Sequence, residues 1–137
     1  MKLKAVLFFG FLSLFSSAFA ANLHTHPQAN DNSKNAATSS MNYPGYCEIE
    51  IINYSSQDVR VSGFFDDRSR LTPFIVYSGD APHYISLYYY GYCHDGMDLY
   101  INTLRGYPVY KGYTPRGTTV YVLPVNGAPY AEVKQKS

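Results

Sequence analysis

Short runs of β-forming residues, separated by turn residues about a dozen positions apart, dominate residues 43–133. All 15 tyrosines of the chain lie in this region, among valine, isoleucine and threonine. The 3.6-residue apolar period of an amphipathic helix is absent. Regularly spaced runs of this kind predict an all-β domain. We place its strands at 47–54, 58–65, 71–78, 83–90, 97–104, 107–113 and 118–123, with a short last strand at 129–133.

About seven strands in a domain of this length fit a single small immunoglobulin-like or Greek-key β-sandwich, with a small closed β-barrel as the alternative. Pro73 and Pro108 cannot donate a ladder hydrogen bond, so their strands are expected at sheet edges or at bulges. In the first strand, alternation places Ile49 and Ile51 toward the core and Glu48 and Glu50 on the other face.

The chain has two cysteines, Cys47 and Cys93. There is no C-x-x-C redox motif, so we predict one structural disulfide between them. Such a bond requires an oxidising compartment, which export would provide.

The first twenty residues predict the route of export. Lys2 and Lys4 precede an apolar run that is too short for a membrane span, and Ala18 and Ala20 fit a signal-peptidase site. We therefore expect a cleaved signal peptide at 1–20 and a periplasmic or extracellular protein with no membrane span. Removal of Lys2 and Lys4 changes the formal charge from +1 to −1. No basic stripe remains, so we expect no nucleic-acid partner.

Polar segments flank the expected domain. Residues 21–42 are rich in Asn, Ala, Ser and Thr and contain few large apolar side chains. A segment of this composition predicts a disordered arm. Residues 134–137 are expected to form a polar tail, which leaves 43–133 as the folded domain.

Tyrosine is the most unusual component of the expected outer surface. If the strands at 83–90 and 97–104 shared a sheet, Tyr84, Tyr88, Tyr90 and Tyr100 would form a tyrosine ladder on its outer face. Tyrosine suits recognition surfaces because it combines an apolar ring with a hydroxyl group. Cross-strand pairing that only stabilises the sheet is the alternative interpretation.

Particular residues also suggest two alternative functions. Metal binding would use His24 and His26, or His83 and His94, since imidazole is a common metal ligand. A glycan hydrolase would use Glu48 and Glu50, which lie two positions apart on one strand face. We rank both below binding, and we assign no catalytic residue, metal ligand or cofactor.

The sequence therefore predicts an exported, non-catalytic binding protein. Its partner would be a protein or a glycan, recognised through a tyrosine-rich sheet face or through loops. Asn53-Tyr54-Ser55 also matches the acceptor sequence for N-glycosylation, which applies only in a eukaryotic secretory pathway.

Overall fold

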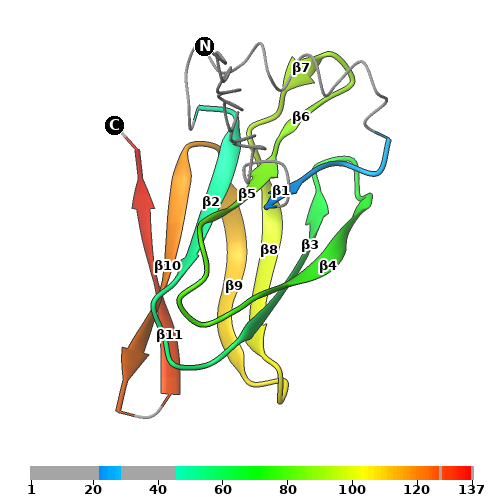
Figure 1. Cartoon of the computed structure of the whole chain (residues 1–137). Coiled ribbons are helices and arrows are strands. Elements are labelled where there is room, and N and C mark those ends of the chain that lie inside the picture. The colour runs from blue at the N-terminus through cyan, green and yellow to red at the C-terminus, as the bar shows by residue number, and fades with distance from the viewer. Residues whose placement is uncertain (1–21, 29–45, 127, 137) are drawn as a thin grey trace, which may run out of the picture.

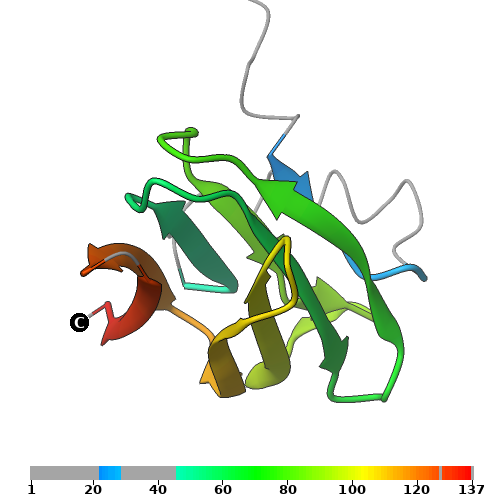
Figure 2. The same cartoon turned by 90° about the horizontal axis from the view of Figure 1, so that it is seen from below.

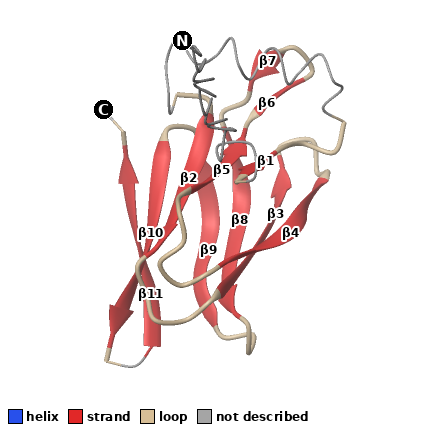
Figure 3. Ribbon diagram, in the orientation of Figure 1, coloured by secondary structure: helices blue, strands red, loops and turns tan. Residues whose placement is uncertain are grey.

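A computed structural model describes residues 22–28, 46–126 and 128–136 of the chain. All regular structure in these residues is β-strand, and no helix occurs among them (Figure 3). One sheet has the spatial order β1 (Leu23–His24), β5 (His83–Ser86), β2 (Glu48–Asn53), β10 (Thr118–Val125) and β11 (Ala128–Gln135). The second has the order β4 (Arg70–Val76), β3 (Val59–Phe65), β8 (Gly96–Thr103) and β9 (Pro108–Pro115). A separate hairpin consists of β6 (Tyr88–Tyr89) and β7 (Tyr92–Cys93) (Figure 1).

The two large sheets form a β-sandwich (Figure 2). Their inner faces share one core, whose fully buried members include Ile49, Ile51, Val59, Val61, Ile85, Leu99, Ile101, Val120 and Val122. Each sheet keeps two edge strands, so the alternative of a closed barrel is wrong. The predicted sandwich is confirmed.

Alternating burial explains why these segments form strands. In β2, Ile49 and Ile51 are fully buried, whereas Glu48 and Glu50 are partly exposed on the opposite face. Apolar residues at every second position give a strand one face to bury. The predicted faces of this strand are therefore confirmed.

The two prolines lie where the sequence places them. Pro73 is in β4 and Pro108 begins β9, and these are the two edge strands of the second sheet. The pairing register also shifts between Val61 and Gly63 of β3, opposite β4, and next to Pro108 in the pairing of β8 with β9. A residue without an N–H group is tolerated at both places because no neighbouring strand needs it.

The strand expected at 83–90 is shorter than predicted. β5 ends at Ser86, and the Leu87 N–H donates to the Cys47 carbonyl at 2.9 Å, outside the ladder. The chain then enters the β6–β7 hairpin, whose turn residues Tyr90 and Gly91 have φ values of 54° and 83°. Two consecutive positive φ values match the two-residue turn that suits the twist of a hairpin.

Both predicted polar ends also differ from the structure. Leu23 and His24 pair in parallel with Tyr84 and Ile85, so the expected disordered arm does not describe residues 22–28. At the other end, Lys134 and Gln135 belong to β11 and pair with β10, so the expected tail at 134–137 starts too early. The expected signal peptide at 1–20 and most of the arm, 29–42, lie outside the described residues.

Candidate functional site: the tyrosine end of the sandwich

The predicted tyrosine ladder is wrong. β5 lies in the first sheet and β8 in the second, so Tyr84 and Tyr100 lie on the outer faces of opposite sheets. Tyr84 donates a hydrogen bond to Oε1 of Glu50 at 3.3 Å. Tyr100 meets the Phe64 ring edge-on, and Nζ of Lys111 lies 5.7 Å from the centre of the Tyr100 ring. Both rings therefore make cross-strand contacts within their own sheets.

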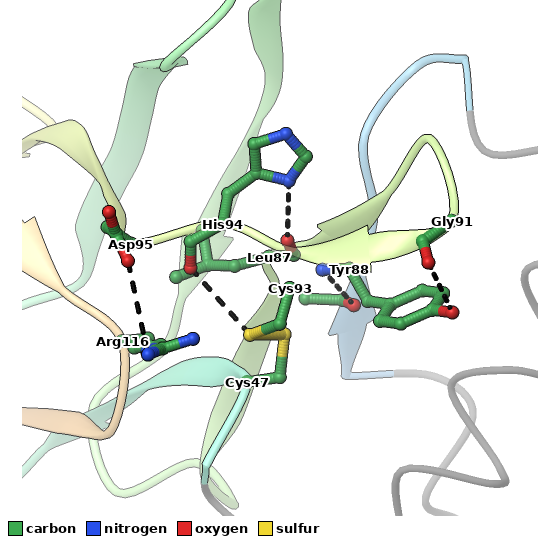
Figure 4. The surroundings of a disulfide bond; sticks show 9 residues. Cys47, Leu87, Tyr88, Gly91, Cys93, His94, Asp95 and Arg116 are labelled. Atoms are coloured by element: carbon green, nitrogen blue, oxygen red, sulfur yellow. Dashed lines mark hydrogen bonds and ion pairs between the residues drawn. A yellow bond between two sulfur atoms is a disulfide. The ribbon is translucent and has the colours of Figure 1, made fainter.

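The other two predicted tyrosines lie in the β6–β7 hairpin. The Tyr88 hydroxyl donates to the Gly91 carbonyl at 3.0 Å (Figure 4). Tyr90 is 61% exposed, and its hydroxyl donates to Oδ2 of Asp67 at 3.1 Å. Its positive φ is uncommon for a bulky residue. Backbone outliers that surrounding contacts hold in place cluster at functional sites, which directs attention to this hairpin.

Four exposed tyrosines gather around one end of the sandwich, which we name the tyrosine end. They are Tyr46, Tyr90, Tyr92 and Tyr113, with exposed fractions of 58%, 61%, 57% and 52%. They come from the segment just before β2, the β6–β7 hairpin and the end of β9, which lie at the same end of the molecule (Figure 1). Loops at the ends of β-sandwiches are frequent binding sites.

Charged residues border these rings. The Tyr113 hydroxyl donates to Oδ2 of Asp66 at 3.4 Å. The guanidinium carbon of Arg116 lies 4.7 Å from the centre of the Tyr46 ring, and the same guanidinium lies 4.0 Å from Oδ1 of Asp95. The exposed rings are therefore held by defined contacts, which reduces the ordering entropy that ligand binding would cost.

An aromatic column supports the hairpin from inside. The Tyr89 ring stacks between His26 and His94, with centroid distances of 4.1 and 3.5 Å, and Tyr92 covers His94 at 4.0 Å. The column thus runs from the N-terminal segment through the buried Tyr89 to the exposed ring of Tyr92. The His94 backbone N–H donates to the Leu87 carbonyl at 3.0 Å, which fixes the base of the hairpin.

The Tyr89 hydroxyl is buried and makes no hydrogen bond of standard geometry in the part of the chain that the structure describes, although the Asp66 backbone N–H lies near it. Burial and the negative charges of Asp66 and Asp67 raise the pKa of Tyr89 to about 12, against a smaller opposite effect of the Asp66 backbone N–H, so the hydroxyl stays protonated. Burying a polar group without a partner costs about 1–3 kcal/mol. Tyr89→Phe is therefore expected to raise the free energy of unfolding by about 1 kcal/mol, measured by urea denaturation. A destabilised variant would contradict this expectation and show that the hydroxyl is satisfied.

His26, Asp67 and Ser69 form a cluster that resembles a catalytic triad in composition. The Gln28 N–H donates to Nδ1 of His26 at 3.0 Å, so the ring carries its hydrogen on Nε2. Nε2 lies 2.9 Å from Oδ2 of Asp67 and also contacts the Ser69 hydroxyl. A triad histidine uses different nitrogens for the serine and the carboxylate, so this cluster lacks the connectivity of a general base.

Asp67 is the hub of that cluster. Burial acts to raise its pKa, but hydrogen bonds from Ser69, His26 and Tyr90 outweigh this effect and hold the pKa of Asp67 well below its usual range. The carboxylate is therefore ionised at neutral pH. It links the β3–β4 turn to the N-terminal segment and to the tip of the hairpin.

Of the two carboxylates that a hydrolase would use, Glu48 and Glu50, Glu50 has a structural role. Burial acts to raise the pKa of Glu50. Hydrogen bonds from Lys136, Thr119 and Tyr84 have a larger, opposite effect, so the pKa of Glu50 is lowered overall. Nζ of Lys136 lies 2.8 Å from Oε2. An ionised, paired carboxylate cannot serve as the general acid that a glycosidase requires.

The histidine pairs expected for metal binding, His24 with His26 and His83 with His94, are not formed. Nε2 of His24 lies 2.9 Å from Nδ1 of His83, whereas His26 joins the aromatic column that contains His94. Within residues 22–28, 46–126 and 128–136, no three His, Cys, Asp or Glu side chains are grouped to hold a metal ion.

The predicted disulfide is confirmed and lies at the tyrosine end. Cys47, just before β2, is bonded to Cys93 of β7, with 5.7 Å between their Cα atoms (Figure 4). The bond joins the first sheet to the hairpin that carries Tyr90 and Tyr92. In the described segments, no helix is long and apolar enough to cross a membrane.

No family model, curated protein or solved structure matches this chain. The site is therefore interpreted from its own chemistry. Tyr90 is the one predicted residue that belongs to it, and Tyr46, Tyr92 and Tyr113 were missed. The run Tyr88-Tyr89-Tyr90-Gly91-Tyr92 does contain a signal, because a glycine between tyrosines favours a hairpin tip with exposed rings.

The glycosylation sequence is not usable in the folded protein. Asn53 is fully buried, and its Nδ2 donates to the carbonyls of Gln57 at 2.8 Å and Val76 at 3.0 Å. The nitrogen that would be modified is thus enclosed and already bonded. This asparagine closes the turn that follows β2.

Proposed function

We propose that this chain is an exported, non-catalytic binding protein that recognises its ligand through the tyrosine end. The observation that carries the proposal is the set of four exposed tyrosines at one end of the sandwich, each held by a contact to a neighbouring ring or charged residue. Exposed aromatic rings on rigid supports are typical anchors of recognition surfaces.

The chemistry of this end favours a glycan over a protein. Tyrosine rings can stack on the apolar faces of sugar rings, while neighbouring carboxylates accept hydrogen bonds from sugar hydroxyls. Asp66, Asp67 and Asp95 are exposed beside the tyrosines. A protein partner would use the same rings as apolar anchors and is the alternative outcome of the test.

The proposed export is supported by the N-terminal pattern of the sequence and by the disulfide, which is compatible with an oxidising compartment. Mass spectrometry of the protein recovered from its source would test this directly. Export by the predicted route requires an N-terminus at Ala21. An intact N-terminus starting at Met1 would contradict it.

The binding test compares two double variants. Tyr90→Ser with Tyr92→Ser removes two rings from the tyrosine end. Tyr77→Ser with Tyr107→Ser removes two rings of similar exposure, 57% and 68%, from the opposite end of the strands. Binding is screened on a glycan array, and pull-down from the periplasmic or extracellular fraction detects a protein partner.

We expect the first double variant to weaken binding at least about tenfold, because anchor residues at an interface contribute more than about 1.4 kcal/mol. The second should bind like the unmodified protein. Both should keep a cooperative thermal transition. Equal losses in the two variants, or no binding to any glycan or protein, would contradict the proposal.

A further inference from the structure

The N-terminal segment Asn22–His26, which we name the strap, is docked at the edge of the first sheet. The Tyr84 N–H donates to the Asn22 carbonyl at 2.8 Å, and Leu23 and His24 pair in parallel with β5. The Asn22 side chain donates to the Pro82 carbonyl at 3.3 Å. β1 contains two residues, so backbone pairing alone gives the strap little stability.

A relay of side chains reinforces this short strand. Nε2 of His83 lies 2.9 Å from Oδ2 of Asp80, and Nδ1 of His83 lies 2.9 Å from Nε2 of His24. The His24 ring stacks flat on Phe74, with 3.4 Å between the ring centroids. The strap thus connects β5, β4 and the loop between them through one imidazole.

Geometry limits how many protons the facing His24 and His83 rings can carry while they keep their hydrogen bond. Nε2 of His83 donates to the Asp80 carboxylate, so in a neutral His83 ring Nδ1 is an acceptor for the Nε2–H of His24. One additional proton can be shared, because one of the facing nitrogens still lacks a hydrogen. If both rings are protonated, two N–H groups and two positive charges face each other at 2.9 Å. That state has no hydrogen bond and strong like-charge repulsion.

We propose that the strap is an acid-released latch, in which double protonation of the facing His24 and His83 rings detaches β1 from the edge strand β5. Release would expose the backbone edge of β5 and the ring face of Phe74, which the strap covers at neutral pH. The inference does not depend on the proposed ligand of the tyrosine end.

The direction of the pH effect follows from the burial of His24. Burial, and next the proximity of His83, lower the pKa of His24 from 6.5 to about 4. The free strap therefore binds a proton more readily than the docked strap. Docking is unaffected above pH 6.5 and weakens as pH falls from 6.5 toward 4, and the loss is complete below 4. A depression of this size changes the docking equilibrium by about three-hundredfold at most.

The charged groups around His24 are few. Asp80 faces it through His83, and the hydrogen bond from His83 lowers the pKa of Asp80, so this carboxylate remains ionised through most of the window. On β5, the Tyr84 hydroxyl is bonded to Glu50 and its pKa is raised, so it does not titrate in acid. Phe74 on β4 carries no charge.

His26, at the far end of the strap, has the opposite electrostatics because it faces the carboxylate of Asp67 at 2.9 Å. The latch is therefore expected to open at β1 while His26 stays in place.

The test follows the strap by NMR in the ¹⁵N-labelled protein from pH 7.5 to 3.5. The Leu23 and His24 amides should lose their ordered shifts and become mobile between pH 6.5 and 4. The titration of the His24 ring, followed by its own nitrogen shifts, should have the same midpoint. Amides of β2 and β10 should remain ordered, which separates release of the strap from global unfolding.

His24→Gln is the matched variant, because its amide can donate to Nδ1 of His83 but cannot be protonated in this range. Its strap should stay ordered at acidic pH. If the variant strap is already undocked at pH 7.5, the His24 ring titration of the unmodified protein decides the question. A strap that stays ordered to pH 3.5, release without titration of His24, or release of a docked His24→Gln strap at the same pH would overturn the proposal.

Discussion

Replacing Cys47 and Cys93 by alanine is expected to lower the free energy of unfolding by about 4 kcal/mol. The disulfide closes a loop with a sequence separation of 46, and cross-linking over that distance removes about this much chain entropy from the unfolded state. In a domain of this size, the loss is a large fraction of the total stability. Guanidinium unfolding of the double variant, compared with the oxidised protein, measures it.

The reduced protein is the control. Its denaturation midpoint should coincide with that of the Cys47→Ala, Cys93→Ala variant, because both proteins lack the cross-link. Only the variant has altered side chains, so a difference between the two midpoints would measure the effect of the side chains. The β6–β7 hairpin should lose order first, since Cys93 is its attachment to the first sheet. A loss smaller than about 1 kcal/mol would show that the unfolded chain is already compact around these residues.

Gly63→Ala is expected to destabilise the sandwich by about 3 kcal/mol or more. A Cβ atom at position 63 would clash with the carbonyl oxygen of Asp98 and would lie 2.8 Å from Cε of Met97. The Met97 side chain can move, but the Asp98 carbonyl belongs to β8, which pairs with β3 along the whole length of β3. Relief of the contact therefore requires separating two central strands.

Gly112→Ala is the matched control. A Cβ atom there would lie 3.5 Å from the Tyr110 hydroxyl, which is an ordinary contact, and β9 is an edge strand. We expect a change within about 1 kcal/mol in either direction. Thermal unfolding followed by circular dichroism compares the two variants. Similar melting temperatures would show that β3 and β8 can separate locally at low cost.

The position of the candidate site shows how far local pattern reasoning extends. Tyr100 points outward as alternation requires, and so does Tyr84. Their assignment to one ladder failed because alternation gives the face of a strand but not the sheet to which it belongs. Sheet membership depends on residues 87–95, which carry the chain from β5 in the first sheet through the β6–β7 hairpin to β8 in the second.

The N-terminal segment shows a second limit. Its composition is that of a disordered arm, yet His24 and His26 each find a specific set of partners. The partners of His24 are His83 and Phe74, and those of His26 are Asp67 and Tyr89. All four lie more than forty residues away in the chain. Composition averages over a segment, whereas docking here depends on two side chains.

Local patterns in the sequence are enough to predict the all-β class, the inward face of β2, the edge positions of the proline-containing strands and the cysteine pair. These features follow from local rules, because side chains alternate along a strand and proline lacks a donor. The three-dimensional packing of the chain determines which strands share a sheet, which tyrosines lie together at one end and which histidine rings face each other. These relations depend on chain crossings and on contacts between distant residues, and no local periodicity encodes them.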